Sequence, residues 1–88
     1  MNEIRENEAR LNITWAGSNG ELTDPVSFDA SDAEVKAWAT EAVRTGGVRG
    51  IPADPHCDLT DFVVDRFGPT EVRPYKLLMI RSKTPFGA

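Results

Sequence analysis

The feature that most constrains the fold is a single amphipathic helix expected over residues 31–47. Ser31 and Glu34 have the spacing of a capping box, in which each side chain satisfies a backbone donor at the helix start. Gly46 and Gly47 are expected to end the helix, because glycine favours the left-handed cap. Apolar residues recur between these ends and form one stripe: Val35, Trp38, Ala39, Ala42 and Val43. A chain with one such stripe must bury it against another element.

A strand is expected before this helix, over residues 11–15. Its sequence LNITW alternates apolar and polar residues, which is the period-two pattern of a half-buried strand. Leu11, Ile13 and Trp15 are therefore predicted to share the face that packs on the helix.

A hairpin is expected to lead from this strand towards the helix. Asn19-Gly20 predicts its turn, because both residues tolerate positive φ. The return strand is placed over residues 25–31, with Val26 and Phe28 pointing inward.

Two more strands are expected after the helix. Residues 48–60 form a connector, because two prolines and Gly50 disfavour regular structure there. The sequences DFVVDRF at residues 61–67 and YKLLMI at residues 75–80 then have the composition of strands.

The last strand carries a predicted partner-binding surface. Lys76 is expected to face water, so by strand alternation Leu78 and Ile80 lie on the same face, away from the helix. Leu77 and Met79 then turn to the core. Exposed apolar residues of this kind mark protein contacts, including possible self-association. The alternative is that a loop, the N-terminal arm or a second copy of the chain buries both faces.

This order of elements predicts an α+β domain. A helix across one face of a mixed sheet of about four strands is the simplest way to bury one stripe. The last strand is expected to lie beside the first, parallel to it, in the centre of the sheet. Such an arrangement is the β-grasp fold. Its predicted core includes Trp15, Phe28, Val35, Trp38, Ala42 and Leu77.

Length and cysteine content are consistent with one small domain. The chain has 88 residues, and its lone Cys57 excludes an internal disulfide and suits a reducing compartment. The N-terminal sequence is too charged for a secretory signal, and no apolar run is long enough to span a membrane. We expect a cytoplasmic protein with a disordered arm (1–10), a folded domain (11–80) and a flexible tail (81–88).

The net charge of −4 is unevenly distributed. Acidic residues outnumber bases over residues 21–65, whereas beyond residue 65 Glu71 is the one acid among several bases: Arg66, Arg73, Lys76, Arg81 and Lys83. Overall acidity argues against binding to nucleic acid. The basic C-terminal end favours docking to an acidic protein surface, and a merely solvated charge distribution is the alternative.

Three short patterns do not amount to a catalytic or metal site. His56 and Cys57 lack a third group and enough ligands for zinc, so a loop histidine beside a semi-buried cysteine is favoured. The glycine-rich residues 45–50 lack the lysine and hydroxyl of a phosphate loop. Four aspartates miss the EF-hand spacing and are expected to form a solvated acidic face: Asp54, Asp58, Asp61 and Asp65. We expect a substrate of enzymes and no enzyme, metal or cofactor.

The C-terminal sequence RSKTPFGA suits a chain that enters an enzyme. Gly87 has no Cβ, so its carbonyl can be approached closely, as adenylation and transfer to a thiolate require. Residues 81–87 span at most about 23 Å when extended. Pro85 lowers the entropy lost on threading. Ala88 would block the Gly87 carboxylate until a peptidase removes it.

The element order and this tail resemble those of ubiquitin-like modifiers. The likeness covers residues 11–87, is most specific from Tyr75 to Gly87, and is greatest to bacterial ubiquitin-like proteins of conjugation pathways. It implies a protein modifier that a peptidase processes between Gly87 and Ala88. It also implies activation by an E1-like enzyme and attachment to a target protein, through an isopeptide bond, by an E2-like enzyme.

The resemblance also implies which tail residues the enzymes recognise: Arg81, Lys83, Pro85 and Phe86. Phe86 departs from the family, in which a Gly-Gly pair ends the chain. A peptidase channel narrowed for two glycines would not accept this tail, so the partner enzymes should be divergent.

Two other functions stay open. A sulfur carrier uses the same adenylation but ends in a thiocarboxylate, and the missing Gly-Gly pair and the presence of Ala88 count against it. A non-covalent interaction module would use the surface formed by Leu78 and Ile80, with an incidental tail.

Overall fold

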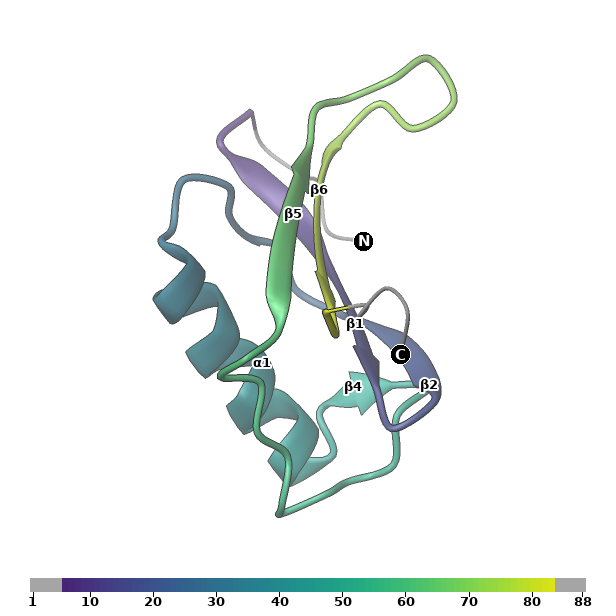
Figure 1. Cartoon of the computed structure of the whole chain (residues 1–88). Helices are drawn as coiled ribbons and strands as arrows, with labels where there is room; N and C mark the ends of the chain where they lie inside the picture. The colour runs from purple at the N-terminus through teal and green to yellow at the C-terminus, as the bar shows by residue number, and fades with distance from the viewer. Residues whose placement is uncertain (1–5, 84–88) are drawn as a thin grey trace, which may run out of the picture.

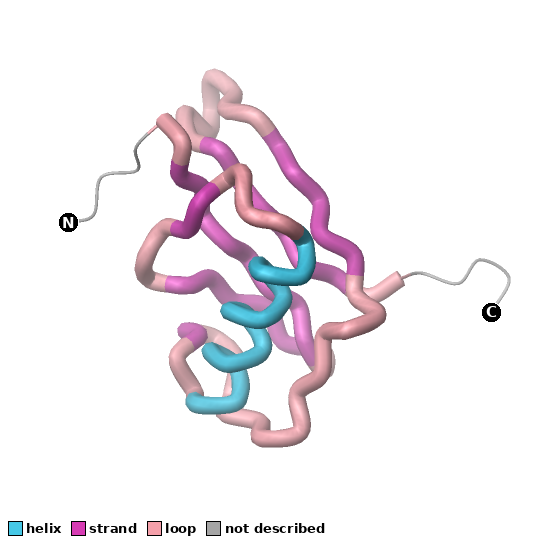
Figure 2. The backbone as a smooth tube through the Cα atoms, turned by 90° about the vertical axis from the view of Figure 1, so that its left-hand side faces the viewer, coloured by secondary structure: helices cyan, strands magenta, loops and turns pink. Residues whose placement is uncertain are grey.

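The computed structural model describes residues 6–83, in which one helix, α1 (Asp32–Thr45), packs on one face of a mixed sheet (Figures 1 and 2). The strands are β1 (Glu8–Trp15), β2 (Ser18–Leu22), β3 (Val26–Ser27), β4 (Val48–Arg49), β5 (Val63–Phe67) and β6 (Lys76–Arg81). The α+β class agrees with the prediction, and the arrangement is compatible with a β-grasp. The sheet has six strands, however, instead of about four.

Strands β1 and β6 form the centre of the sheet. The order is β4-β2-β1-β6-β5, and β3 pairs with the start of β1. The β1–β6 pair is parallel, with Leu11 opposite Leu78 and Ile13 opposite Ile80. Parallel neighbours need a long crossover, and α1 lies within it. The predicted central and parallel position of the last strand is confirmed.

Helix α1 begins and ends as predicted. The Glu34 N–H donates to Ser31 Oγ at 3.2 Å, and the Ser31 N–H donates to Glu34 Oε1 at 3.1 Å, which completes the capping box. Gly46 caps the other end in the left-handed conformation, with φ 78°. The side chains that the helix buries are spaced four residues apart: Val35, Ala39 and Val43.

The prediction that Trp38 belongs to the core is wrong. Its side chain is 40% exposed. On a helix of 3.6 residues per turn, Trp38 is rotated by about 100° from Ala39, the middle of the buried face. The buried stripe is therefore narrower than the apolar pattern suggests.

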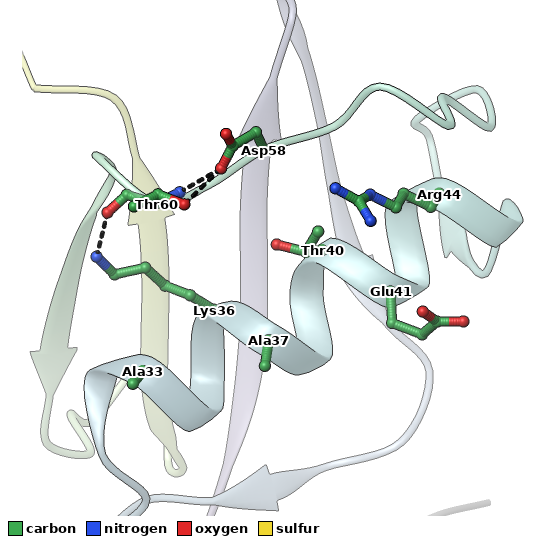
Figure 3. Close-up of a pocket in the computed structure, with 8 residues that line it drawn as sticks. All are labelled: Ala33, Lys36, Ala37, Thr40, Glu41, Arg44, Asp58 and Thr60. Carbon is green, nitrogen blue, oxygen red and sulfur yellow. Dashed lines mark hydrogen bonds between the residues drawn. The ribbon is translucent and has the colours of Figure 1, made fainter.

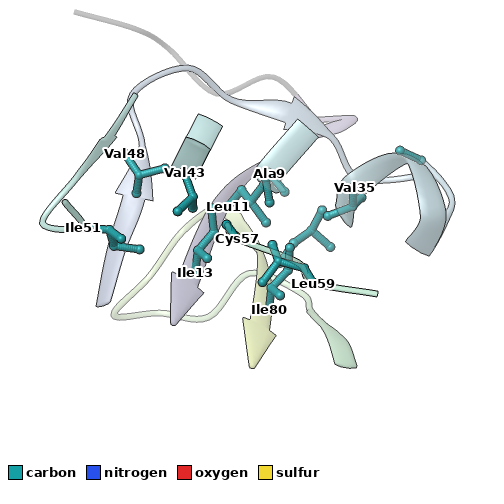
Figure 4. Close-up of a cluster of buried hydrophobic side chains, with 13 residues drawn as sticks. Ala9, Leu11, Ile13, Val35, Val43, Val48, Ile51, Cys57, Leu59 and Ile80 are labelled. Atoms are coloured by element: carbon teal, nitrogen blue, oxygen red, sulfur yellow. The ribbon is translucent and has the colours of Figure 1, made fainter. Parts of the chain in front are cut away.

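The core lies between α1 and the sheet (Figure 4). Its largest fully buried side chains come from β1, β6, the helix and the connector: Leu11, Ile13, Val35, Val43, Cys57, Leu59, Leu78 and Ile80. Of the predicted core residues, Val35 is fully buried. Three others are half-buried and pack against the core: Trp15, Phe28 and Ala42.

The hairpin turn lies at Ala16-Gly17 and not at Asn19-Gly20. Ala16 and Gly17 have φ of 50° and 82°, so both adopt the left-handed conformation of a two-residue hairpin turn. Gly20 lies within β2, where a Cβ would come within 2.1 Å of the Arg49 carbonyl oxygen. This glycine therefore permits the close approach of β4 and does not form the turn.

The strand boundaries also differ from the prediction, most clearly at three places. The return strand is β2, and the predicted residues 25–31 contribute only the two-residue β3. The connector 48–60 begins with β4, which pairs with β2. Strand β1 starts at Glu8, so it includes residues placed in the arm. Within residues 6–83, no helix has the length and apolar character needed to cross a membrane.

Candidate interaction surface and tail exit

The predicted partner-binding residues Leu78 and Ile80 lie in the core. Both side chains are fully buried. Lys76 explains the difference, because it lies on the helix side of the sheet with its Nζ 4.9 Å from the centroid of the Phe28 ring. A lysine can pack its aliphatic stem in this way while its ammonium meets an aromatic ring. Alternation then brings Leu78 and Ile80 inward, so the prediction of their exposure is wrong.

Leu77 and Met79 lie instead on the sheet face opposite α1. The register with β5 places Leu77 opposite Phe67, which is 41% exposed. Val63 shares this face by alternation, and so do Asp65 and Arg81, whose ion pair lies among the apolar residues. We call the set Val63, Phe67, Leu77 and Met79 the outer apolar face. Within residues 6–83, no helix covers it (Figure 2).

The rest of the same sheet face, over β1 and β2, is polar. Asn19 Nδ2 donates to Asn12 Oδ1 at 2.7 Å and to Thr14 Oγ1 at 2.9 Å. Asn12 Nδ2 donates back to Asn19 Oδ1 at 3.1 Å. Because these groups satisfy one another, an apolar partner surface would fit only the half formed by β5 and β6.

The tail leaves the sheet at the end of β6. There Arg81 Nε donates to Asp65 Oδ2 at 2.5 Å, which forms an ion pair between β6 and β5. Arg81, predicted as a docking charge, is thus partly engaged in holding the root of the tail. Lys83 is exposed. The remaining predicted tail residues lie outside the described residues: Pro85, Phe86, Gly87 and Ala88.

A groove of about 500 Å³ lies between α1 and residues 58–60 (Figure 3). Lys36 Nζ donates to the Thr60 carbonyl oxygen at 2.9 Å, and Arg44 Nε donates to the Cys57 carbonyl oxygen at 2.9 Å. Both cations therefore hold the connector against the helix. On the groove's lining the Thr60 hydroxyl donates to Asp58 Oδ1 at 2.6 Å, so these polar groups also belong to the packing of the connector.

The His56–Cys57 pair is a loop histidine beside a cysteine, as favoured, but the cysteine is more deeply buried than the semi-buried position expected. His56 is exposed, whereas the Cys57 side chain is fully buried in the core. Burial, and then the negative charge of Asp54, raises the pKa of the Cys57 thiol. A buried thiol with a raised pKa is a poor nucleophile.

Asp54 and Asp58 accept hydrogen bonds within the connector. Asp54 accepts from Trp15 Nε1 at 2.8 Å and from the His56 N–H at 2.9 Å. Asp58 accepts from the hydroxyl and the N–H of Thr60. The Trp15 bond lowers the pKa of Asp54, and the Thr60 hydroxyl lowers that of Asp58. Among the residues that the structure describes, no cluster of acidic, histidine or cysteine side chains could hold a metal ion.

Sequence reasoning missed the outer apolar face because it assigned the opposite alternation to β6. Strand β5 also divides into two faces, with Val63, Asp65 and Phe67 on one and Val64 and Arg66 on the other. This alternation does not say which set is buried. The long-range bonds of Arg66 to residues 28–32 decide it, and no local pattern predicts them.

No family model, no curated protein and no solved structure matches this chain. The relation to ubiquitin-like proteins therefore stays a prediction. The fold, the outer apolar face and the start of the tail are the features of the molecule that bear on its function.

Proposed function

We propose that the protein is a ubiquitin-like modifier with a β-grasp fold, attached to target proteins through Gly87. The observation that carries this proposal is the position of β6, which lies beside β1 and parallel to it. A β-grasp consists of a hairpin, a crossover helix and a last strand that returns to the centre of the sheet. The order β2-β1-β6-β5 fits this plan, with β3 and β4 as two-residue additions.

This position of β6 gives the tail a rigid root. The strand has a neighbour on each side, and its inward side chains Leu78 and Ile80 are fully buried. The Arg81–Asp65 pair lies at its last residue. From there residues 81–87 span at most about 23 Å, enough to carry Gly87 into a neighbouring active site.

The proposed chemistry begins with hydrolysis of the Gly87–Ala88 peptide bond by a peptidase. An E1-like enzyme then joins the free Gly87 carboxylate to AMP, with release of pyrophosphate from ATP. A thiolate of the E1-like enzyme displaces AMP, and a thiolate of the E2-like enzyme then displaces the first thiol. An amine of the target finally displaces the thiol of the E2-like enzyme. Glycine leaves the carbonyl unhindered at each displacement. Exposed Lys83, with Pro85 and Phe86, would guide the tail into these enzymes.

The test is to identify what becomes attached to Gly87 in cells that produce this protein naturally. Trypsin cuts after Lys83, so a conjugate leaves residues 84–87 on the acceptor amine as a diagnostic remnant. Mass spectrometry should find this remnant with the natural sequence. Gly87→Val should abolish it, because a branched side chain crowds the carbonyl. Ser82→Ala, a tail variant that spares Gly87, should retain it.

The contrary result is equally specific. If every chain recovered still carries Ala88 and the remnant is absent in cells that express the protein, the modifier proposal is wrong. The outer apolar face then favours a second candidate, a non-covalent interaction module. Such a module should keep its complexes in the Gly87→Val variant and lose them when Leu77 and Met79 are both replaced by Ser.

A further inference from the structure

The two edges of the sheet differ in how they are protected. Strand β4 (Val48–Arg49) ends one edge with only two residues, and Gly50, with φ 98°, turns the chain immediately after it. Strand β5 (Val63–Phe67) forms the other edge with five residues and, within residues 6–83, pairs only with β6. Its register with β6 is uninterrupted, so it has no bulge, and it contains no proline.

Proteins usually protect such an edge with short strands, prolines, bulges, charged side chains, or a helix or loop that covers it. The two charged residues of β5 do not serve this purpose, because other groups of the molecule hold both. Asp65 accepts a hydrogen bond from Arg81. The Arg66 guanidinium donates to backbone carbonyl oxygens in residues 28–30 and to the Asp32 carboxylate, all at 2.6–2.7 Å. Within residues 6–83, the β5 backbone pairs with β6 and with no other strand, while α1 contacts β5 on the helix side.

Acidic side chains border this edge. Asp61 is exposed two residues before β5, and Asp29 is exposed in the segment that Arg66 contacts. The Asp32 side chain is 59% exposed and neutralises Arg66, the strand's own cation. A second copy of the chain would bring the same acids to the interface, whereas a basic segment would be attracted to them.

We propose that the β5 edge is a strand-addition site for an extended, basic segment of a partner protein. The segment's backbone would complete the hydrogen bonds that β5 leaves open. Its apolar side chains would lie beside Val63 and Phe67 on the outer apolar face, on either side of Asp65, which Arg81 holds. Its basic side chains would lie on the helix side, near Asp29 and Asp32. This site requires neither Gly87 nor conjugation, so it can hold even if the proposed function fails.

The probe is the synthetic peptide Thr-Val-Lys-Val-Lys-Val-Thr, titrated into isotope-labelled protein and followed by NMR. Shifts should concentrate in Val63–Phe67, and every second amide of this strand should exchange more slowly with solvent. The alternation is expected because the other β5 amides already face β6. The same peptide N-methylated at its central valine and at the following lysine should bind at least about tenfold more weakly, because one of two successive strand amides faces β5 and its donor is lost.

A pair of charge reversals tests the acidic border. Asp29→Lys should weaken peptide binding about threefold to tenfold, whereas Glu41→Lys, an exposed site near the other end of α1, should change it little. Three outcomes would each overturn the proposal. They are shifts confined to Leu77 and Met79 without alternate protection in β5, equal binding of the N-methylated peptide, and pairing of two copies through β5 in place of peptide binding.

Discussion

The two faces of strand β6 carry similar residues and have opposite roles. Leu78 and Ile80 point towards α1 and are fully buried, whereas Leu77 and Met79 point the other way and are half-buried. The hydrophobicity of the strand does not distinguish the pairs. What distinguishes them is the element that lies above each face, since α1 covers one face and, within residues 6–83, no helix covers the other. The inner pair stabilises the fold, whereas the outer pair stays partly accessible to solvent.

The largest expected effect separates these two pairs directly. Leu78→Ala should lower the free energy of unfolding by about 2 to 5 kcal/mol, because it leaves a cavity under the helix. Leu77→Ala should lower it by about 0.5 to 1.5 kcal/mol, because its side chain is already partly solvated. Urea unfolding of the two variants, with Ile80→Ala and Met79→Ala as a second matched pair, measures the difference. Similar losses for both members would contradict the assignment of faces.

This comparison also shows why the sequence predicted the ends of helix α1 better than the orientation of strand β6. The helix caps depend on residues three or four apart, so Ser31, Glu34 and Gly46 predict them correctly. The orientation of β6 depends on Lys76, which was expected in water and packs on Phe28, a residue distant in the chain. Because strand alternation has a period of two, one wrongly placed residue reverses the whole strand.

The candidate site was predictable only in part for the same reason. The sequence predicts an apolar sheet face beside the tail. Which residues form it is decided by the tertiary contacts of Lys76 and Arg66, which place both on the helix side. The hairpin shows the same limit. Gly20 matches a turn signal, yet it lies in β2 because β4 approaches it closely from a distant part of the sequence.

Helix α1 allows a smaller version of the same comparison. Val35→Ala removes few atoms from a fully buried site and should cost about 1.5 to 3 kcal/mol of stability. Trp38→Ala removes a large ring that is 40% exposed and should cost about 1 to 2 kcal/mol, well below the 3 to 5 kcal/mol of a buried aromatic. Thermal unfolding of both variants tests this order. A loss for Trp38→Ala of about the size expected for a buried aromatic would place this residue back in the core.

The smallest expected effect concerns the ion pair between Arg81 and Asp65, at the root of the tail. The Arg81 and Asp65 side chains are 48% and 30% exposed, so solvent and salt screen their attraction. Arg81→Ala should therefore lower the free energy of unfolding by no more than about 1 kcal/mol. A double-mutant cycle with Asp65→Ala, measured at low and high salt, isolates the pair, and its coupling should shrink as salt is added.

The matched control is Lys83→Ala, which removes an exposed charge beyond the end of β6 and should leave stability unchanged. If the pair holds the start of the tail, Arg81→Ala should reduce attachment through Gly87 by more than its small stability loss accounts for. Conjugation at the natural level in Arg81→Ala would show that the central position of β6 is sufficient to position the tail. A loss of several kcal/mol in the free energy of unfolding would instead show that the end of β6 depends on this ion pair. The outer face of the sheet would then stabilise the fold, as the inner face does.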